Sequence, residues 1–216
     1  MAKVMLLAAS LLFVAGVATA GIIDPCNSPV EMLEGTQYQT LATKCYFACP
    51  QGDTGSLRSA GFYFSFLIRN NLASPMGGIP ASDFWLIDCD PLRDLALCAG
   101  SASSNADSST NENGRTTMSQ TSIAAGGCAQ GLAPVVQGYV LEQPGSCTPY
   151  CFDVKVRSCD MNGDLLMSLV DLSIFAGYYP PQPYNTCGDF DCNGAVALSD
   201  LSRFAFHYGP PGHKCT

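Results

Sequence analysis

Basic residues and histidine are scarce in this chain. Its 216 residues contain 10 lysines and arginines against 18 aspartates and glutamates, which gives a formal net charge of −8 at pH 7. The basic residues are scattered and form no stripe, which excludes the usual way of binding nucleic acid. The only histidines are His207 and His213, and the sequence has no Gly-x-Ser-x-Gly motif. The pattern of a serine hydrolase is therefore missing.

Long apolar runs are also rare, and only the N-terminal region has one. There Lys3 precedes an apolar run over Val4–Val17, and small residues at 18–20 come before Gly21. This order is typical of a cleavable secretory signal peptide, to which we assign residues 1–20. A membrane anchor is the alternative, but the run is too short to cross a bilayer comfortably. We expect a secreted protein, extracellular or associated with the cell surface, that does not span a membrane.

Cysteine, in contrast, is abundant, because the chain has 12 and all of them follow residue 20. An even number of cysteines in an exported protein predicts a set of disulfides. A zinc site is the alternative, but Cys45 and Cys49 have no histidine nearby to complete it. The connectivity does not follow from sequence. Spacing allows the pairs Cys89–Cys98, Cys192–Cys215 and Cys159–Cys187, with further bridges among Cys26, Cys45, Cys49 and Cys128.

A twelve-residue acidic sequence occurs twice in the last third of the chain. "DMNGDLLMSLVD" begins at residue 160, and "DFDCNGAVALSD" begins 29 residues later. The agreement continues behind the acidic residues, where Leu172, Phe175 and Tyr179 are repeated as Leu201, Phe204 and Tyr208. A solvated acidic loop is the alternative interpretation, but it requires neither a fixed spacing nor a shared sequence behind it. The repeat therefore favours a site with a defined geometry.

The spacing of oxygen-bearing residues in these loops predicts calcium binding. A calcium loop supplies side-chain oxygens from positions 1, 3, 5 and 12, a backbone carbonyl from position 7, and often a bridging water at position 9. We expect two Ca²⁺ ions. Ser168 is at position 9 of the first loop, where the second loop has Ala197. The predicted ligands are Asp160, Asn162, Asp164, Leu166, Ser168 and Asp171 in the first loop, and Asp189, Asp191, Asn193, Ala195 and Asp200 in the second.

Position 6 of such a loop is a sharp turn that favours glycine, because the backbone there has a positive φ. The second loop has Gly194 at this position, whereas the first has Leu165. A left-handed non-glycine residue costs roughly 1–2 kcal/mol. We therefore expect the second loop to bind its ion more tightly.

An amphipathic pattern follows each loop. Apolar residues recur at helical spacing at Leu172, Phe175, Ala176 and Tyr179, and again at Leu201, Phe204, Ala205 and Tyr208. Before the first loop, "FDVKVRSC" alternates apolar and charged residues, which is typical of a strand. The sequence predicts two loop–helix units that share one small core.

This pair of units resembles a dockerin, the duplicated calcium-loop module that plugs enzymes into cohesin domains in cellulosomes. The resemblance extends from about Phe152 to the end of the chain. It implies two Ca²⁺ ions, an antiparallel pair of loop–helix units and a cohesin-like partner. The best-known dockerins carry a hydroxyl pair at loop positions 10 and 11, where this chain has Leu169-Val170 and Leu198-Ser199.

The residues before this module predict short strands. "GFYFSFLIRN" places Phe62, Phe64, Phe66 and Ile68 on one face. Further strands are expected around Phe84–Ile87, after the Asn113-Gly114 turn, and in "APVVQGYVLE", with a helical turn in Pro91–Leu97. Between Ser59 and Leu141 the turn motifs "GIP" and "TNENGRTT" resemble a bacterial immunoglobulin-like domain of the invasin and intimin kind, which implies an antiparallel sandwich.

Other functions find weaker support in the sequence. A glycosidase needs two carboxylates across a cleft, and the first part offers candidates without a motif: Asp53, Asp83, Asp88, Asp90, Asp94, Asp107 and Glu112. Trp85 is a candidate sugar-stacking residue, but it lies within an apolar stretch that favours core packing.

We therefore predict a multidomain protein: a signal peptide over 1–20, an all-β immunoglobulin-like sandwich over 21–150 and a small α dockerin-like calcium module over 151–216. The predicted function is non-catalytic, with the sandwich acting as an adhesion or spacer domain. The module would attach it to a cohesin-like or other cell-surface protein, in polysaccharide-degrading or cell-surface assemblies. The alternative is a carbohydrate-binding module or small glycan-active enzyme carried by a dockerin, with polysaccharide as a further ligand.

Overall fold

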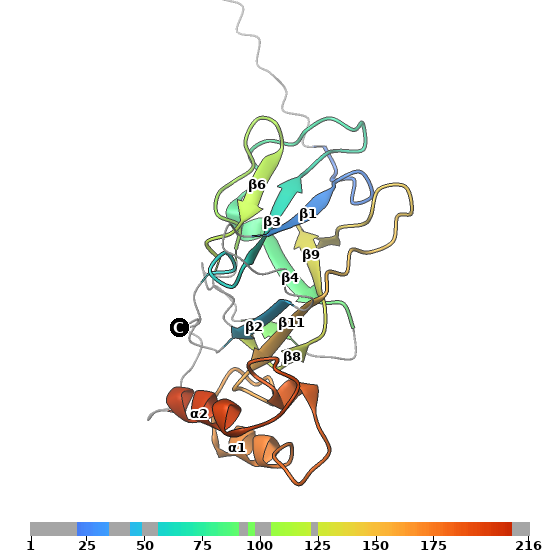
Figure 1. The fold of residues 1–216 in the computed structure, drawn as a ribbon. Helices are drawn as coiled ribbons and strands as arrows, with labels where there is room; N and C mark the ends of the chain where they lie inside the picture. The colour runs from blue at the N-terminus through green and yellow to red at the C-terminus, as the bar shows by residue number, and fades with distance from the viewer. Residues whose placement is uncertain are drawn as a thin grey trace, which may run out of the picture.

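The computed structural model describes residues 21–34, 44–48, 56–90, 95–97, 105–121 and 125–208. The predicted signal peptide lies outside these residues. Within them the protein is mostly β-sheet, with two short α-helices gathered at one end (Figure 1). No helix in this part of the chain is both long and apolar enough to cross a bilayer.

The first sheet has the order β1-β3-β6 and is antiparallel. It consists of β1 (Val30–Glu34), β3 (Phe62–Leu67) and β6 (Arg115–Met118). The expected alternation in β3 is confirmed, because Phe62, Phe64 and Phe66 are fully buried. The expected turn before β6 is confirmed as well: Gly114 has a φ of +71° and its N–H donates to the Asn111 carbonyl at 2.8 Å.

The second antiparallel sheet has the order β10-β9-β4. It consists of β4 (Phe84–Asp88), β9 (Leu132–Val136) and β10 (Tyr139–Val140), and the 3-10 turn η1 (Ala81–Asp83) leads into β4. The sequence predicted one strand where β9 and β10 form a hairpin. Gln137 and Gly138 have φ values of +49° and +84°, which reverse the chain there. Phe66 of the first sheet contacts Phe84 of the second, with ring centroids 5.2 Å apart.

A third sheet joins segments that lie far apart in the sequence. In it β11 (Val154–Ser158) lies parallel to β2 (Lys44–Ala48) and antiparallel to β8 (Cys128–Ala129). Beside it, β5 (Ala96–Leu97) pairs with β7 (Ala125–Gly126). A helical turn was expected near β5, but residues 96–97 are a strand and residues 91–94 lie outside the described residues. The division at residue 150 stays a prediction, and the third sheet takes strands from both sides of it.

The tail contains the two helices that the sequence predicted, α1 (Leu169–Ala176) and α2 (Leu198–His207), with a 3-10 turn, η3 (Thr186–Gly188), between them. Phe175 stacks on Phe190 and on Phe204, with centroids 5.3 and 5.4 Å apart. The two units thus share a core, as expected. This core also receives Phe47 of β2, whose ring lies 5.2 Å from that of Phe190.

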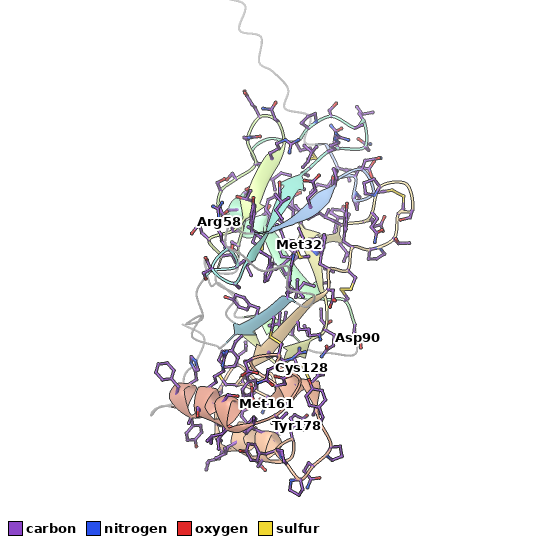
Figure 2. The ribbon with its side chains drawn as sticks, in the orientation of Figure 1. Met32, Arg58, Asp90, Cys128, Met161 and Tyr178 are labelled. Atoms are coloured by element: carbon purple, nitrogen blue, oxygen red, sulfur yellow. A yellow bond between two sulfur atoms is a disulfide. The ribbon has the colours of Figure 1, made fainter. Side chains whose placement is uncertain are left out.

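Four disulfides join cysteines within the described residues: Cys26–Cys147, Cys45–Cys192, Cys89–Cys151 and Cys128–Cys187. The pairs considered from spacing, Cys89–Cys98, Cys192–Cys215 and Cys159–Cys187, are therefore wrong. Those pairs joined cysteines close in sequence, whereas the third sheet brings distant segments together. Two bridges among Cys26, Cys45, Cys49 and Cys128 are wrong as well, because Cys26, Cys45 and Cys128 each pair outside that set. Figure 2 places Cys128 where this sheet meets the helical tail. Multiple disulfides fit a secreted or extracellular protein.

Asp107 organises the loop that leads into β6. Its N–H donates to the Thr117 carbonyl at 2.8 Å, and its carboxylate accepts hydrogen bonds from the Thr117 hydroxyl (2.6 Å) and the Gln120 N–H (2.8 Å). Ser119 donates to the same carboxylate through both its N–H and its hydroxyl. Partial desolvation raises the pKa of Asp107, but these hydrogen bonds outweigh it and hold the pKa below its ordinary value.

We expect Asp107→Asn to lower the free energy of unfolding by about 1–2 kcal/mol at neutral pH, because a partly exposed charged acceptor is replaced. A lowered pKa in the folded state stabilises the protein above the unfolded-state pKa, and this contribution is lost as the pH falls through the folded-state pKa. Urea unfolding from neutral to acidic pH should therefore show the gap between variant and wild type closing in acid. Asp153→Asn, at an exposed position, is the control and should change little at any pH.

Candidate metal centre

The first acidic loop follows β11 and runs into α1, and the second follows η3 and runs into α2. In the first loop Asp160 and Asp171 are fully buried; in the second loop Asp200 is fully buried and Asp189 is 2 % exposed. These are the carboxylates at the first and last positions of each loop. Burial of four acids in so small a module requires groups that offset their charge.

In the second loop the end carboxylates hold the backbone in a closed curl. Asp189 accepts hydrogen bonds from the N–H groups of Asn193 (3.0 Å) and Gly194 (2.9 Å). Asp200 accepts from the N–H of Phe190 (2.7 Å) on one oxygen and from that of Ala197 (2.9 Å) on the other. Asp200 therefore joins the start of the loop to its end.

Three carboxylates of the second loop converge on one point. Asp189, Asp191 and Asp200 each offer an oxygen, and these oxygens lie within 4.8 Å of one another. Such a group of hard oxygen donors matches what Ca²⁺ requires. Asn193, at position 5, accepts from the Ala195 N–H at 2.9 Å through its side-chain oxygen.

The first loop repeats this arrangement. Asp160 accepts from the N–H groups of Gly163 (2.9 Å) and Leu165 (2.7 Å). Asp171 accepts from Met161 (2.8 Å) and Ser168 (2.7 Å). A three-carboxylate group like that of the second loop is not found among its described residues, where position 3 is an asparagine, Asn162.

Asn162 and Asp164, the predicted ligands at positions 3 and 5 of the first loop, are exposed. The Asn162 amide donates to Asp164 at 2.8 Å, and Asp164 accepts from the Leu166 N–H at 2.9 Å. Ser168 is the N-cap of α1, where its hydroxyl accepts from the Val170 N–H at 3.1 Å. Its predicted role in holding a water, and the roles of the Leu166 and Ala195 carbonyls, stay predictions.

Both loops turn through left-handed backbone at two places. Position 6 has a positive φ in each, +63° at Leu165 and +91° at Gly194, as a calcium loop requires. Position 4 is also left-handed, with +72° at Gly163 and +53° at Cys192. Each loop therefore has one glycine and one non-glycine residue in this conformation. The strain at Leu165 does not by itself rank the two sites, because Cys192 bears a comparable strain.

Asp160, the first carboxylate of the first loop, lies in surroundings that disfavour its charged form. The pKa of Asp160 is raised to about 6. Burial is the largest cause and the negative charges of Asp171 and Asp164 act in the same direction, while hydrogen bonds from the N–H groups of Leu165 and Gly163 act against them. Within the described residues the donors to the end carboxylates are neutral: backbone N–H groups and the hydroxyls of Ser168, Ser199 and Tyr184. A cation in the loop would offset this repulsion, so the residues present fit a bound Ca²⁺.

Two contacts to the loops were not predicted from the sequence. The Tyr184 hydroxyl donates to Asp189 at 2.8 Å. Partial burial and this hydrogen bond raise the pKa of Tyr184, which keeps its hydroxyl a donor. On the first loop, the Gly127 N–H donates to the Asp160 carbonyl at 2.7 Å. Both donors lie outside the twelve-residue loops, so the loop spacing carries no signal for them.

Alternative sites gain no support from the geometry. Trp85 is half-buried in β4 opposite Val135, and His207 is buried with its ring 5.3 Å from that of Phe47. Cys26, Cys147 and Glu142 lie close together, but the two cysteines form a disulfide. Several candidates lie outside the described residues: Asp53, Asp94 and His213.

Comparison with protein-family models, curated proteins and solved structures finds no match to this chain.

Proposed function

We propose that residues 151–216 form a dockerin-like module that binds two Ca²⁺ ions and attaches the protein to a cohesin-like partner. The proposal rests chiefly on the convergence of Asp189, Asp191 and Asp200 within 4.8 Å in a loop whose fold is repeated 29 residues earlier. Bound calcium would offset the negative charge of these carboxylates. The chain's own part is to hold them: the backbone N–H groups fix each end carboxylate, and the left-handed positions close the loop.

The outer side of α1 supports a docking role. Leu169 and Val170 are 70 % and 54 % exposed, and Leu198, at the matching position of α2, is 68 % exposed. From residue 165 to residue 188 the only charged side chain is that of Asp171, which is buried. A pocket of about 290 Å³ is lined by residues of both helices and of the segment after α1, among them Leu172, Pro181 and Leu201. This surface suits an apolar face of a protein partner more than a charged one.

For the β-rich part we propose a non-catalytic adhesion or spacer domain of the immunoglobulin-like kind. Support comes from two three-stranded antiparallel sheets that contact each other through Phe66 and Phe84. Sheet β1-β3-β6 lies at the end of the molecule opposite α1 and α2 (Figure 1). A partner bound at the helices would leave that sheet available to the surroundings, in a cell-surface or polysaccharide-degrading assembly.

Calcium titration of the oxidised full chain by calorimetry tests the proposal. We expect two ions per chain in the wild type and one in each of Asp171→Asn and Asp200→Asn, because each substitution removes the carboxylate that joins the two ends of one loop. Saturation at one hundred times the dissociation constant should stabilise the fold by about 2.7 kcal/mol per site. Identical thermal unfolding in chelator and in millimolar calcium, with no binding heat, would contradict the proposal. Ser173→Ala, on the exposed side of α1, is the control and should keep both ions.

A further inference from the structure

Strand β7 of the β-rich part lies directly against the first acidic loop. The Ser158 hydroxyl donates to the Ala125 carbonyl at 2.9 Å and accepts from the Asp160 N–H at 3.1 Å. Two residues further on, the Gly127 N–H donates to the Asp160 carbonyl at 2.7 Å. The backbone of Asp160 is therefore held on both sides by residues 125–127 and by the strand that leads into the loop.

Between these two anchors, Gly126 faces the Asp160 side chain with no space between them. A Cβ at residue 126 would lie 1.9 Å from Oδ2 of Asp160, 2.6 Å from its Cγ and 3.1 Å from the Cα of Gly163. Gly126 does not have a positive φ, so glycine is required there because a side chain has no room, and not because of the backbone conformation. On the other side, the N–H groups of Gly163 and Leu165 hold the same carboxylate. Asp160 thus lies between β7 and its own loop.

We propose that Gly126 and Gly127 are positioning residues of the first calcium site, so that β7 forms one wall of it. This inference rests on the proposed function, since it assigns residues to the same metal site. The second site is built differently, because Asp189 receives the Tyr184 hydroxyl from within the tail. Calcium in the first loop is therefore coupled to the β-rich part through β7, and this route is specific to that loop.

Coupling of this kind acts in both directions. If β7 fixes Asp160 for calcium, then calcium bound by Asp160 holds β7 in place, and the Gly127 amide exchanges its hydrogen more slowly in calcium than in chelator. The Ile68 amide, which donates to the Gly114 carbonyl at 2.8 Å next to the first sheet, is a comparison site outside the acidic loops. Its exchange should slow less than that of Gly127.

The experiment is a calcium titration of the full chain carrying Gly126→Ala, followed by NMR at the Gly163 and Gly194 amides, one in each loop. We expect the affinity of the first loop to fall at least tenfold while that of the second stays unchanged. Gly77→Ala is the matched control, because its Cβ would lie 2.8 Å from the Asn111 carbonyl oxygen in a turn of the β-rich part. Its clash is milder than that at residue 126 but meets backbone atoms, and it should leave both affinities unchanged.

Each outcome bears on the proposal. A folded Gly126→Ala protein with an unchanged first loop, or with equal losses in both loops, would overturn it and leave the proposed calcium module standing. A wild type that binds no calcium would overturn both. If Gly126→Ala does not fold, the exchange measurement on the wild type decides: selective slowing at Gly127 supports the wall, and equal slowing at Gly127 and Ile68 refutes it.

Discussion

Arg157→Ala is expected to lower the free energy of unfolding by about 3–5 kcal/mol, because it removes a buried charged side chain together with the hydrogen bonds that satisfy its neighbours. Arg157 is fully buried in β11. One terminal nitrogen donates to the carbonyls of Ala129 (2.7 Å) and Val156 (2.9 Å). The other donates to the Thr186 hydroxyl (2.7 Å) and to the Gln130 side chain (3.3 Å). One guanidinium thus joins β8, β11 and η3.

Alanine at this position leaves a cavity and several acceptors without their donor, and each of these effects is destabilising. The measurement is urea unfolding of the oxidised full chain, followed by the fluorescence of Trp85. Lys155→Ala, two residues earlier on the same strand and half-buried, is the control and should cost less than 1 kcal/mol. Equal losses for the two variants would mean that Arg157 does not join the tail to the sheet.

Removal of the Cys45–Cys192 disulfide by a double alanine substitution should cost on the order of 4–5 kcal/mol. The bridge joins residues 147 apart in sequence, and the chain-entropy model gives about this value for so long a loop. The same change should weaken the second calcium loop, because Cys192 is the left-handed residue at its fourth position. The unfolding midpoint in denaturant and a calcium titration measure the two effects.

The Cys26–Cys147 bridge is a matched control for this prediction. It closes a loop of similar length, with a separation of 121 residues, but neither cysteine lies in an acidic loop. Its removal should lower stability by a similar amount and leave calcium affinity unchanged. If both double variants leave calcium affinity unchanged, the conformation of the second loop does not depend on its disulfide.

Local features of this protein could be predicted from its sequence. The alternation in β3, the Asn113-Gly114 turn and the periodic residues after each loop act over a few residues, so a short window contains their whole cause. The positive φ at position 6 of both loops was predicted from loop chemistry in the same way. The hairpin at Gln137-Gly138 was missed because glutamine does not mark a left-handed position.

Contacts between distant segments could not be predicted in this way. The parallel pairing of β2 with β11 joins residues more than 100 positions apart. A local sequence pattern does not indicate which distant strand will be the partner. The disulfide pairs were wrong for the same reason, because they follow that pairing. Phe47 and Gly126 gave no signal either. In the sequence Phe47 resembles any strand residue and Gly126 any loop glycine. Their importance follows only from the tail residues that pack against them.

The bridge between β2 and the second loop also has a mechanical consequence. A pulling force applied between a partner held at the tail and the β-rich part reaches Cys45 directly through Cys192. The segment between these cysteines, which are 147 positions apart, would extend to roughly 500 Å if the bridge were absent. With the bridge intact, that length is shielded from tension. An attached protein pulled through α2 in flowing liquid would then keep the first acidic loop, which lies between the two cysteines in the chain, folded under loads that would unravel a chain of the same sequence without the crosslink.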